Sequence, residues 1–344
     1  MGLRERLAAG PVVCAEGYLF ELERRGYLQA GSFVPEVVLE HPDKVATLHE
    51  DFVWAGSDVV EAFTYYAHRE KLRLIGKEHL LEQVNLEALR IAREVARDNS
   101  TLLAGNICNT NVFEPDSPTS TVEVRAMFTE QVGWAVASDV DFVIGETFSY
   151  AAEALIALEV IREAGLPAVV TLAMHQSPLT RDGWSVAEAG RRLADAGADV
   201  VGLNCIRGPS TMLPLLAELV PAVDVPVAAL PVPYRTTPAE RSFQSLSDPV
   251  GERAGGPDRP FPVALDPLTC TRFEIAAFTR AARELGVSYL GVCCGAGPHH
   301  IRAMSEALGR TPPASRYSAD MSKHAFLGSD ASLRSHNLAY GVDY

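Results

Sequence analysis

Three cysteines stand in two short glycine-containing motifs that lie far apart in the chain. Cys205 ends the run GLNC, and Cys293 and Cys294 are adjacent in GVCCG. Thiolate sulfur is a preferred ligand of zinc, which takes four ligands in tetrahedral geometry. If the two motifs meet in the fold, three thiolates would hold the ion and leave one position open for a substrate, as in catalytic zinc sites.

A plainer interpretation of these cysteines is also open. Isolated cysteines are commonly small buried hydrophobic side chains. We expect this role for the other three, Cys14, Cys108 and Cys270. The adjacent pair differs, because successive residues of a strand face opposite sides. Cys294 can join Cys293 on one ion only where the strand has ended, and Gly295 and Gly297 would allow such a turn. Spacing alone does not decide between the two interpretations.

The elements that would bring the motifs together are indicated by short apolar runs that alternate with longer amphipathic segments. The apolar runs predict eight strands, at residues 11–15, 58–64, 101–105, 141–145, 168–173, 199–203, 226–230 and 288–292. The amphipathic segments predict helices at residues 84–98, 122–138, 151–164, 185–196, 211–219 and 271–285. Gly165, Gly197 and Gly286 each stand just before a predicted strand, where glycine commonly ends a helix.

Strands that are each followed by a helix predict an α/β fold, a single-domain (β/α)8 TIM barrel over residues 1–310. The alternative is an open doubly wound sheet. It normally carries a glycine-rich phosphate turn after the first strand, and CAEGYLFELE does not supply one. A long Pro- and Gly-rich loop, residues 231–262, follows the seventh strand and is expected to cover an active site or to lack structure. Residues 311–344 form a tail that we expect to pack on the barrel or on a partner subunit.

Composition narrows the class of function. The chain has 344 residues and a formal net charge of −14, a field that repels phosphate backbones and argues against nucleic acid as a partner. No apolar run approaches the roughly 20 residues of a membrane span, so no membrane partner is expected. The start MGLRERLAAG lacks the apolar core of a signal peptide, and we therefore expect a cytoplasmic protein.

The active site of a TIM barrel lies where its strands end. The predicted strands are followed by Glu16, Tyr65, Tyr66, Asn106, Glu146, His175, Cys205, Pro231, Cys293 and Cys294. Strands six and eight both neighbour strand seven. The two cysteine motifs are therefore expected to converge above the mouth of the barrel.

Taken together, GLNC and GVCCGAGPHHIRAM resemble the paired signature of the homocysteine S-methyltransferase family. The resemblance extends to the betaine–homocysteine branch through LFELERRGYLQAG, PEVVLEHPDKV, LHEDFVWAGSDVVEAFTYYAHREKL, LAGNICNT, ALDPLTCTRFEI, PPAS and MSKH, and so covers nearly the whole chain. It implies a barrel that holds Zn²⁺ through Cys205, Cys293 and Cys294. Homocysteine would bind there through its sulfur and receive a methyl group from a small onium donor, giving methionine.

The resemblance also implies roles for residues around the metal. Glu146, in FVIGETFSY, matches a family glutamate that holds the amino group of homocysteine, and Tyr66 matches a tyrosine near the metal and the donor. Quaternary ammonium and sulfonium groups bind well against aromatic faces. The candidates for such a donor site are Phe33, Tyr65, Tyr66 and Phe148.

Several positions depart from the family pattern. Where the family has an aspartate before two glycines, this chain has Ala15, Glu16 and Gly17. Either Glu16 takes over the aspartate's contact, with Gly17 beside it in the substrate site, or the substrate differs. Phe33 and Thr147 stand where the betaine enzymes resemble one another in having tryptophan and tyrosine. These changes leave the zinc-thiolate chemistry intact and bear on the donor alone. The resemblance implies a donor like glycine betaine, with S-methylmethionine and dimethylsulfoniopropionate as alternatives.

Two other functions stay open at the level of sequence. A barrel lyase or aldolase would use Glu146 with a lysine or a metal. A non-catalytic zinc-binding barrel would have kept the fold after losing the Asp-Gly-Gly turn. No organic cofactor is indicated, and we expect a homo-oligomer.

Overall fold

The computed structural model describes residues 1–344, apart from the side chain at position 343. Eight parallel strands close into a barrel in chain order. They are β1 (Val12–Ala15), β2 (Val59–Glu61), β3 (Leu102–Cys108), β4 (Phe142–Phe148), β5 (Ala168–Leu172), β6 (Val200–Asn204), β7 (Val227–Leu230) and β8 (Tyr289–Val292). Pairing of β1 with β8, with Val12 opposite Tyr289, closes the barrel. The prediction of a TIM barrel is confirmed.

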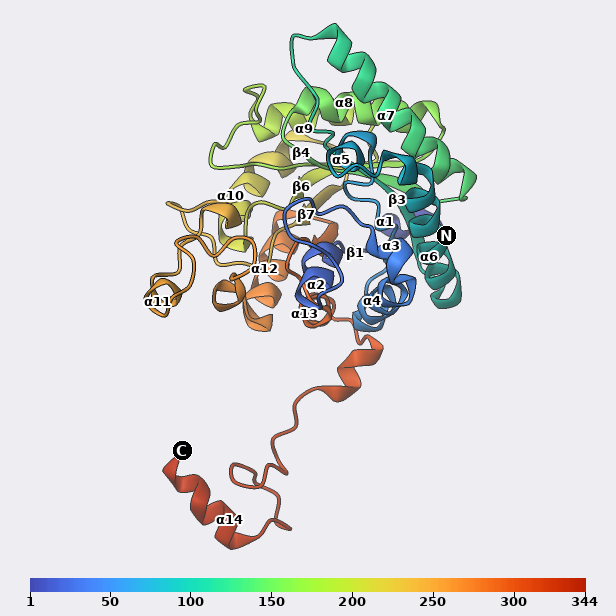
Figure 1. Cartoon of the computed structure of the whole chain (residues 1–344). Helices are drawn as coiled ribbons and strands as arrows, with labels where there is room; N and C mark the ends of the chain where they lie inside the picture. The colour runs from blue at the N-terminus through green and yellow to red at the C-terminus, as the bar shows by residue number, and fades with distance from the viewer.

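Helices surround the strands on the outside of the barrel (Figure 1). The longer ones are α4 (Pro42–Ala55), α6 (Leu81–Asn99), α7 (Pro118–Ala137), α8 (Ala151–Glu163), α9 (Val186–Asp195), α10 (Pro209–Leu219), α12 (Arg272–Leu285) and α13 (Pro298–Ala307). Shorter helices are α1 (Leu3–Ala9), α2 (Tyr18–Arg24), α3 (Val37–Glu40), α5 (Arg69–Leu74), α11 (Pro249–Arg253) and α14 (Ser335–Tyr340). The ends of α12 follow from its sequence: Thr271 and Glu274 form a capping box, and Gly286 ends the helix at a φ of 109°.

Two strands are longer than the sequence predicts. β3 and β4 each continue three residues beyond the predicted end, because their backbones stay paired as far as Cys108 opposite Glu146. Glu146 therefore lies within a strand and not in the loop after it. The second strand is shorter than predicted and ends at Glu61.

Alternate residues along the strands fill the inside of the barrel, as the two-residue period of a strand requires. A buried cluster of these inward side chains contains Val12, Cys14, Val59, Leu102, Ala104, Phe142, Ile144, Val169, Val200, Ala228, Leu230 and Tyr289. The intervening residues, such as Val13 and Val143, belong to the larger core between the strands and the helices. The inside of the barrel is thus a packed core, and two cavities lie toward the carboxyl ends of the strands.

Two segments lie outside the repeating pattern. The loop after β7 is packed in part against the barrel, since Phe243 of the short helix η3 (Phe243–Ser245) is only 3% exposed. The tail beyond α13 runs away from the barrel and ends in α14 (Figure 1). Among the described residues, we find no helix with the length and apolar character needed to cross a bilayer.

Candidate active site

The inward-facing positions of six strands end in polar side chains at the carboxyl mouth of the barrel. Each continues the alternation set by the apolar residues below it, as Glu16 follows Val12 and Cys14. The six are Glu16, Glu61, Asn106, Glu146, Asn204 and Cys293, and all are buried. The register of each strand decides which of its residues face the inside of the barrel, and therefore which polar side chains meet at its mouth.

Two asparagines connect the carboxylates of this layer. The Asn106 Nδ2 amide donates to Glu61 Oε1 and to Glu146 Oε1, both at 2.6 Å. The Asn204 Nδ2 amide donates to Glu146 Oε2 at 2.6 Å and approaches Glu16 Oε2 at 3.4 Å. The Thr147 hydroxyl also donates to Glu146, at 3.0 Å. Glu146 is therefore fixed by three donors, whereas Glu16 is held weakly.

The charges of this layer are not balanced by the side chains that form it. Burial raises the pKa of Glu146 to about 7. Burial, and then the nearby Glu146 carboxylate, raise the pKa of Glu16 and of Glu61 well above the ordinary value. The Glu16 Oε1 atom and the Asn106 Oδ1 atom are buried without a hydrogen-bond partner. Acceptor atoms left in this way suit a cationic donor group of a ligand.

A narrow cavity lies beside these oxygens. It measures about 20 Å³, which is room for one group the size of a water molecule or an ammonium group. Its lining includes Glu16, Glu61, Glu146 and Cys293. The site can therefore hold a positively charged nitrogen close to sulfur.

The two cysteine motifs meet at this mouth. The Sγ atoms of Cys205, Cys293 and Cys294 lie within 4.8 Å of one another, and each residue is less than 10% exposed. The thiols of Cys293 and then Cys294 donate to Cys205 and hold its pKa well below the ordinary value. Burial raises the pKa of Cys293. Three sulfur atoms so arranged form a possible metal-binding cluster of the kind that soft or borderline ions prefer.

The backbone conformation near each motif sets the positions of these sulfur atoms. Cys205 follows the end of β6 and adopts a φ of 54°, while its N–H still bonds to Leu230 O at 2.9 Å. Gly295 turns the chain after Cys294 with a φ of 93°, and a Cβ atom there would overlap the Tyr234 hydroxyl. The expectation that the strand has ended before Cys294 agrees with β8 ending at Val292.

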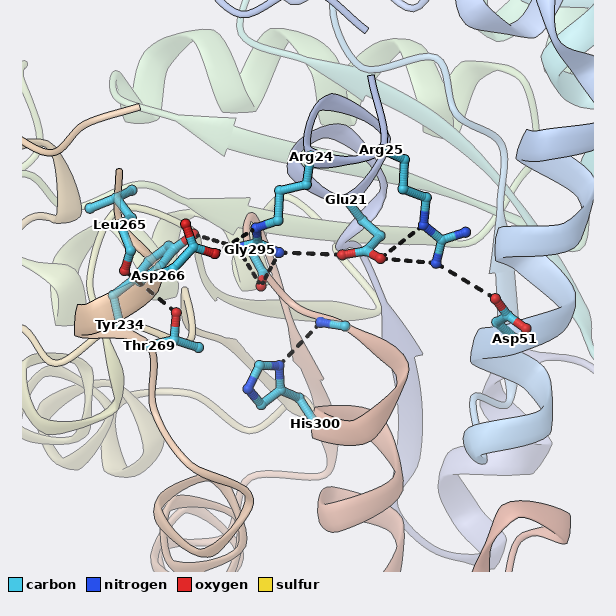
Figure 2. A network of polar contacts seen from close by, with 11 residues as sticks. Glu21, Arg24, Arg25, Asp51, Tyr234, Leu265, Asp266, Thr269, Gly295 and His300 are labelled. Carbon is cyan, nitrogen blue, oxygen red and sulfur yellow. Dashed lines mark hydrogen bonds and ion pairs between the residues drawn. The ribbon is translucent and has the colours of Figure 1, made fainter. Parts of the chain in front are cut away.

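A network of hydrogen bonds and ion pairs around Gly295 holds this turn in place (Figure 2). Arg24 donates to Gly295 O at 3.3 Å and to the Tyr234 hydroxyl at 3.0 Å. Arg24 also pairs with Asp266 at 3.4 Å, which ties α2 to the segment before α12. The His300 Nδ1 atom accepts the Gly297 N–H at 3.1 Å, so this histidine caps α13 (Figure 2), and its Nε2 atom lies 3.0 Å from Cys270 O.

A larger cavity of about 250 Å³ opens above the sulfurs. Its lining consists of Leu19, Phe20, Phe33, Tyr65, Tyr66, Asn109, Asn111, Thr147, Ser149, His175, Arg181, Cys205, Ile206, Phe243, Gln244, Phe261 and Cys294. Three of the predicted donor-site residues, Phe33, Tyr65 and Tyr66, are among them. The rings of Tyr65 and Tyr66 lie 4.3 Å apart between centroids.

The structure does not bring the other two predicted contacts to this cavity. Phe148 faces outward from β4, is fully buried and packs edge-on against Phe128 of α7 at 5.9 Å. Gly17 precedes α2 and lies against the chain after β8, where a Cβ atom would come within 2.5 Å of Ala296 O. Gly17 thus allows the close approach of two segments.

Sequence reasoning missed several residues of the site. Glu61 and Asn204 face the centre because of strand register, a signal present in the alternation of apolar residues once the strand bounds are known. Phe20, Phe243 and Phe261 line the cavity from α2 and from the loop after β7, and no local pattern indicates that they meet.

The chain resembles known proteins over most of its length. A family model described as homocysteine S-methyltransferase matches residues 15–308. Betaine–homocysteine S-methyltransferase 1 of Xenopus tropicalis is 38% identical over 344 residues, covering 95% of this chain and 80% of the relative. An S-methylmethionine–homocysteine S-methyltransferase of Pongo abelii is 36% identical over 334 residues, covering 95% and 86%.

A solved structure shows the same fold. The metallated homocysteine methyltransferase of Escherichia coli superposes with a TM-score of 0.68 at 18% identity, covering 88% of this chain and 99% of that one. Fold and sequence together define an S-methyltransferase built on a TIM barrel. The chain belongs to the homocysteine S-methyltransferase family.

Proposed function

We propose that this protein transfers a methyl group from a small onium compound, glycine betaine or a similar donor, to the sulfur of homocysteine, giving methionine. The observation that carries the proposal is the cluster of Cys205, Cys293 and Cys294, which lies between a cavity bearing carboxylates and a cavity bearing aromatic rings. One cavity suits an ammonium group, the other suits a methyl-onium group, and sulfur lies at the boundary.

We propose Zn²⁺ as the resident metal, held by these three cysteines. Their sulfurs are mutually close, buried and free of disulfides, which fits a borderline ion that prefers thiolate. The chemistry supplied by bound Zn²⁺ is a lowered pKa of the acceptor thiol, which then reacts as a thiolate. Three protein ligands leave a position for that sulfur.

We propose that Glu146, with Glu16 beside it, binds the ammonium group of homocysteine. Asn106, Asn204 and Thr147 hold the Glu146 carboxylate in place by the hydrogen bonds described above. Glu16 offers a buried oxygen with no partner. A carboxylate fixed in this way orients the acceptor without further reorganisation, which is how an enzyme lowers the entropic part of a barrier.

The aromatic side chains serve the donor. Tyr65, Tyr66 and Phe33 line the cavity that contains the Cys205 and Cys294 sulfurs, and ring faces attract methyl-onium groups. The acceptor sulfur supplies the electron pair of the new S–C bond. The bond between the methyl carbon and the donor's nitrogen or sulfur breaks. Its electron pair stays on that atom, and the donor leaves as a neutral amine or sulfide. No proton has to be added to the leaving group, so the residues need only align the reactants and exclude water.

A donor panel tests the proposal. The zinc-loaded protein is incubated with homocysteine and, separately, glycine betaine, dimethylsulfoniopropionate or S-methylmethionine, and methionine is measured. We expect methionine with at least one donor, loss of activity on chelation, and recovery when zinc is restored. Zinc binding without methionine from any donor would instead support a non-catalytic zinc-binding barrel. Turnover that survives complete chelation would rule out the metal-dependent mechanism.

We propose a cytoplasmic homo-oligomer in which residues 311–344 contact a second copy of the chain. The support is that this segment runs away from the barrel (Figure 1) and carries exposed aromatic side chains, including Tyr317, Tyr340 and Tyr344. Sedimentation of the intact chain at micromolar concentration tests this, because a monomer at all concentrations would contradict it.

A further inference from the structure

The β7–α12 segment, residues 231–271, has its two ends paired with each other. The Cys270 N–H bonds to Pro233 O at 2.7 Å, and a bridge of antiparallel type pairs Tyr234 with Thr269. The side chain of Tyr234 is completely buried, and its ring stacks on that of Phe243 at 5.8 Å, with an angle of 11° between the ring planes. The way in which Tyr234 is held therefore affects the packing of the whole segment.

Arg24 of α2 joins this paired base to the turn that follows the cysteine pair (Figure 2). Its guanidinium donates to the Tyr234 hydroxyl at 3.0 Å and to Gly295 O at 3.3 Å. The same group pairs with Asp266 at 3.4 Å. Tyr234 and Asp266 belong to the two ends of the β7–α12 segment, whereas Gly295 directly follows Cys294. One side chain thus connects three parts of the chain that lie far apart in sequence.

The connection depends on the shape of the guanidinium group. Its N–H donors lie in one plane in a fixed arrangement, so Arg24 can bond to a hydroxyl and to a carbonyl at the same time. Gly295 and the Tyr234 hydroxyl are also in direct contact, since there is no room between them for a Cβ atom at position 295. Loss of the guanidinium would remove a donor from both oxygens, and the two segments would then lose their common support.

We propose that Arg24 is a positioning residue that couples the β7–α12 segment to the turn after β8, and so controls how tightly Cys293 and Cys294 retain a metal ion. The part that concerns the metal rests on the proposed function, because it takes these cysteines as zinc ligands. The coupling between the two segments does not require a metal. Arg24 lines neither of the two cavities, so it acts through the backbone of the turn and not by contact with a substrate.

The rate of zinc release tests the proposal. The zinc-loaded protein is mixed with an excess of a colour-forming chelator, and release is followed by absorbance. Arg24→Gln should release zinc about 10- to 100-fold faster than the wild type, the range found for residues that support metal ligands from outside the coordination shell. Arg24→Lys keeps the charge but lacks the planar group, so its rate should lie between the two. An unchanged rate in Arg24→Gln would overturn the proposal.

The matched control is Arg25→Gln. Arg25 is the next residue of the chain and pairs with Glu21 at 2.9 Å and with Asp51 of α4 at 3.7 Å, away from the cysteine turn (Figure 2). The control removes the same charge and also takes one partner from Glu21, and it should release zinc at the wild-type rate. Equal acceleration in both variants would show that the charge, or the stability of α2, is responsible, and would contradict the coupling.

A second substitution tests the path of the coupling. Tyr234→Phe keeps the ring that stacks on Phe243 and removes the hydroxyl that accepts from Arg24. It should also speed zinc release. Adding it to Arg24→Gln should change the rate by less than about threefold, because both substitutions remove the same interaction. Rates that multiply independently would exclude this path.

Hydrogen exchange separates this inference from the proposed function. Backbone exchange is measured by mass spectrometry on the intact chain, with and without zinc. Arg24→Gln should speed exchange in residues 231–271 and in residues 293–297 together, and Arg25→Gln should speed it in neither. If the three cysteines bind no zinc, the proposed metal site fails, and the exchange result alone decides the coupling. Faster exchange in both segments would then support it, and a change in one segment or in neither would refute it.

Discussion

Replacing Glu146 by glutamine tests the acceptor site most directly. The Glu146 carboxylate accepts hydrogen bonds from Asn106, Asn204 and Thr147 through its two oxygens. Glutamine keeps one oxygen and places an NH₂ group where the other was. One amide donor must then face another donor, unless Asn106 rotates and gives up its bond to Glu61 at 2.6 Å.

The expected loss has two parts. An acceptor ammonium group would lose a charge-assisted hydrogen bond, worth about 1.5–3 kcal/mol, which is roughly a 10- to 150-fold weaker Kd. The mismatched amide leaves buried donors facing each other, which lowers the free energy of unfolding of the ligand-free protein by about 1–3 kcal/mol. The three sulfurs are untouched, so the zinc content should stay near one per chain.

The effect of Glu146→Gln depends on pH in a defined direction. Burial raises the pKa of Glu146 to about 7. The ionised form binds an ammonium group, so the affinity of the wild-type protein should rise as pH increases from about 6 to 8. The glutamine variant lacks this ionisation, so its affinity should rise less steeply over the same range. The rise that comes from loss of the thiol proton on binding to zinc is common to both proteins. The two proteins should therefore differ most at pH 8 and converge below pH 6.

The assay is calorimetric titration of homocysteine into the zinc-loaded proteins at pH 6, 7 and 8, with metal content measured on the same samples. The control is Glu153→Gln. Glu153 is also buried, but it accepts hydrogen bonds from Thr110 outside the pocket. The Glu153→Gln substitution should therefore leave the pH dependence of homocysteine binding unchanged. An unaltered Kd at pH 8 for Glu146→Gln would refute the role of Glu146. Loss of zinc from that variant would show that the residue serves the metal and not the acceptor.

Two further predictions concern the sulfurs and the carboxylate layer. Cys205→Ser should lower the zinc content, measured by elemental analysis, well below one per chain. The control Cys270→Ser changes a cysteine away from the cluster and should leave the zinc content unchanged. Equal zinc content in the two variants would exclude Cys205 as a ligand. Glu61→Gln should raise the Tm of the ligand-free protein at pH 8 and have little effect at pH 5. Burial raises the pKa of Glu61, so its folded form resists ionisation and stability falls as pH rises above the unfolded pKa of about 4.3. A Tm lowered equally at both pH values would contradict this reasoning.

Much of the fold could be predicted because the signals are local. Apolar runs indicated all eight strands, and glycines such as Gly286 indicated helix ends. No helix was predicted where α4 lies, and the larger errors in the strand bounds lie at the mouth of the barrel. β3 and β4 were predicted too short, because Asn106 and Glu146 are polar and interrupt the apolar run, although pairing between the strands continues past them. Polar residue types such as these predict a loop, but inside the mouth of a barrel their backbone can still be paired as a strand.

The sequence by itself determined the chemical groups: two cysteine motifs, a glutamate after an apolar run and several aromatic residues. Only the tertiary structure decided which of them meet. Asn204 of β6 reaches Glu16 after β1 and Glu146 of β4 because the closed barrel brings these strands to one centre. Phe148 lies two residues after the inward-facing Glu146 and yet faces outward, because the register between β4 and β5 shifts between Gly145 and Phe148. Contacts of this kind depend on register and closure, which arise from pairing along the whole length of the strands and leave no mark at any single position.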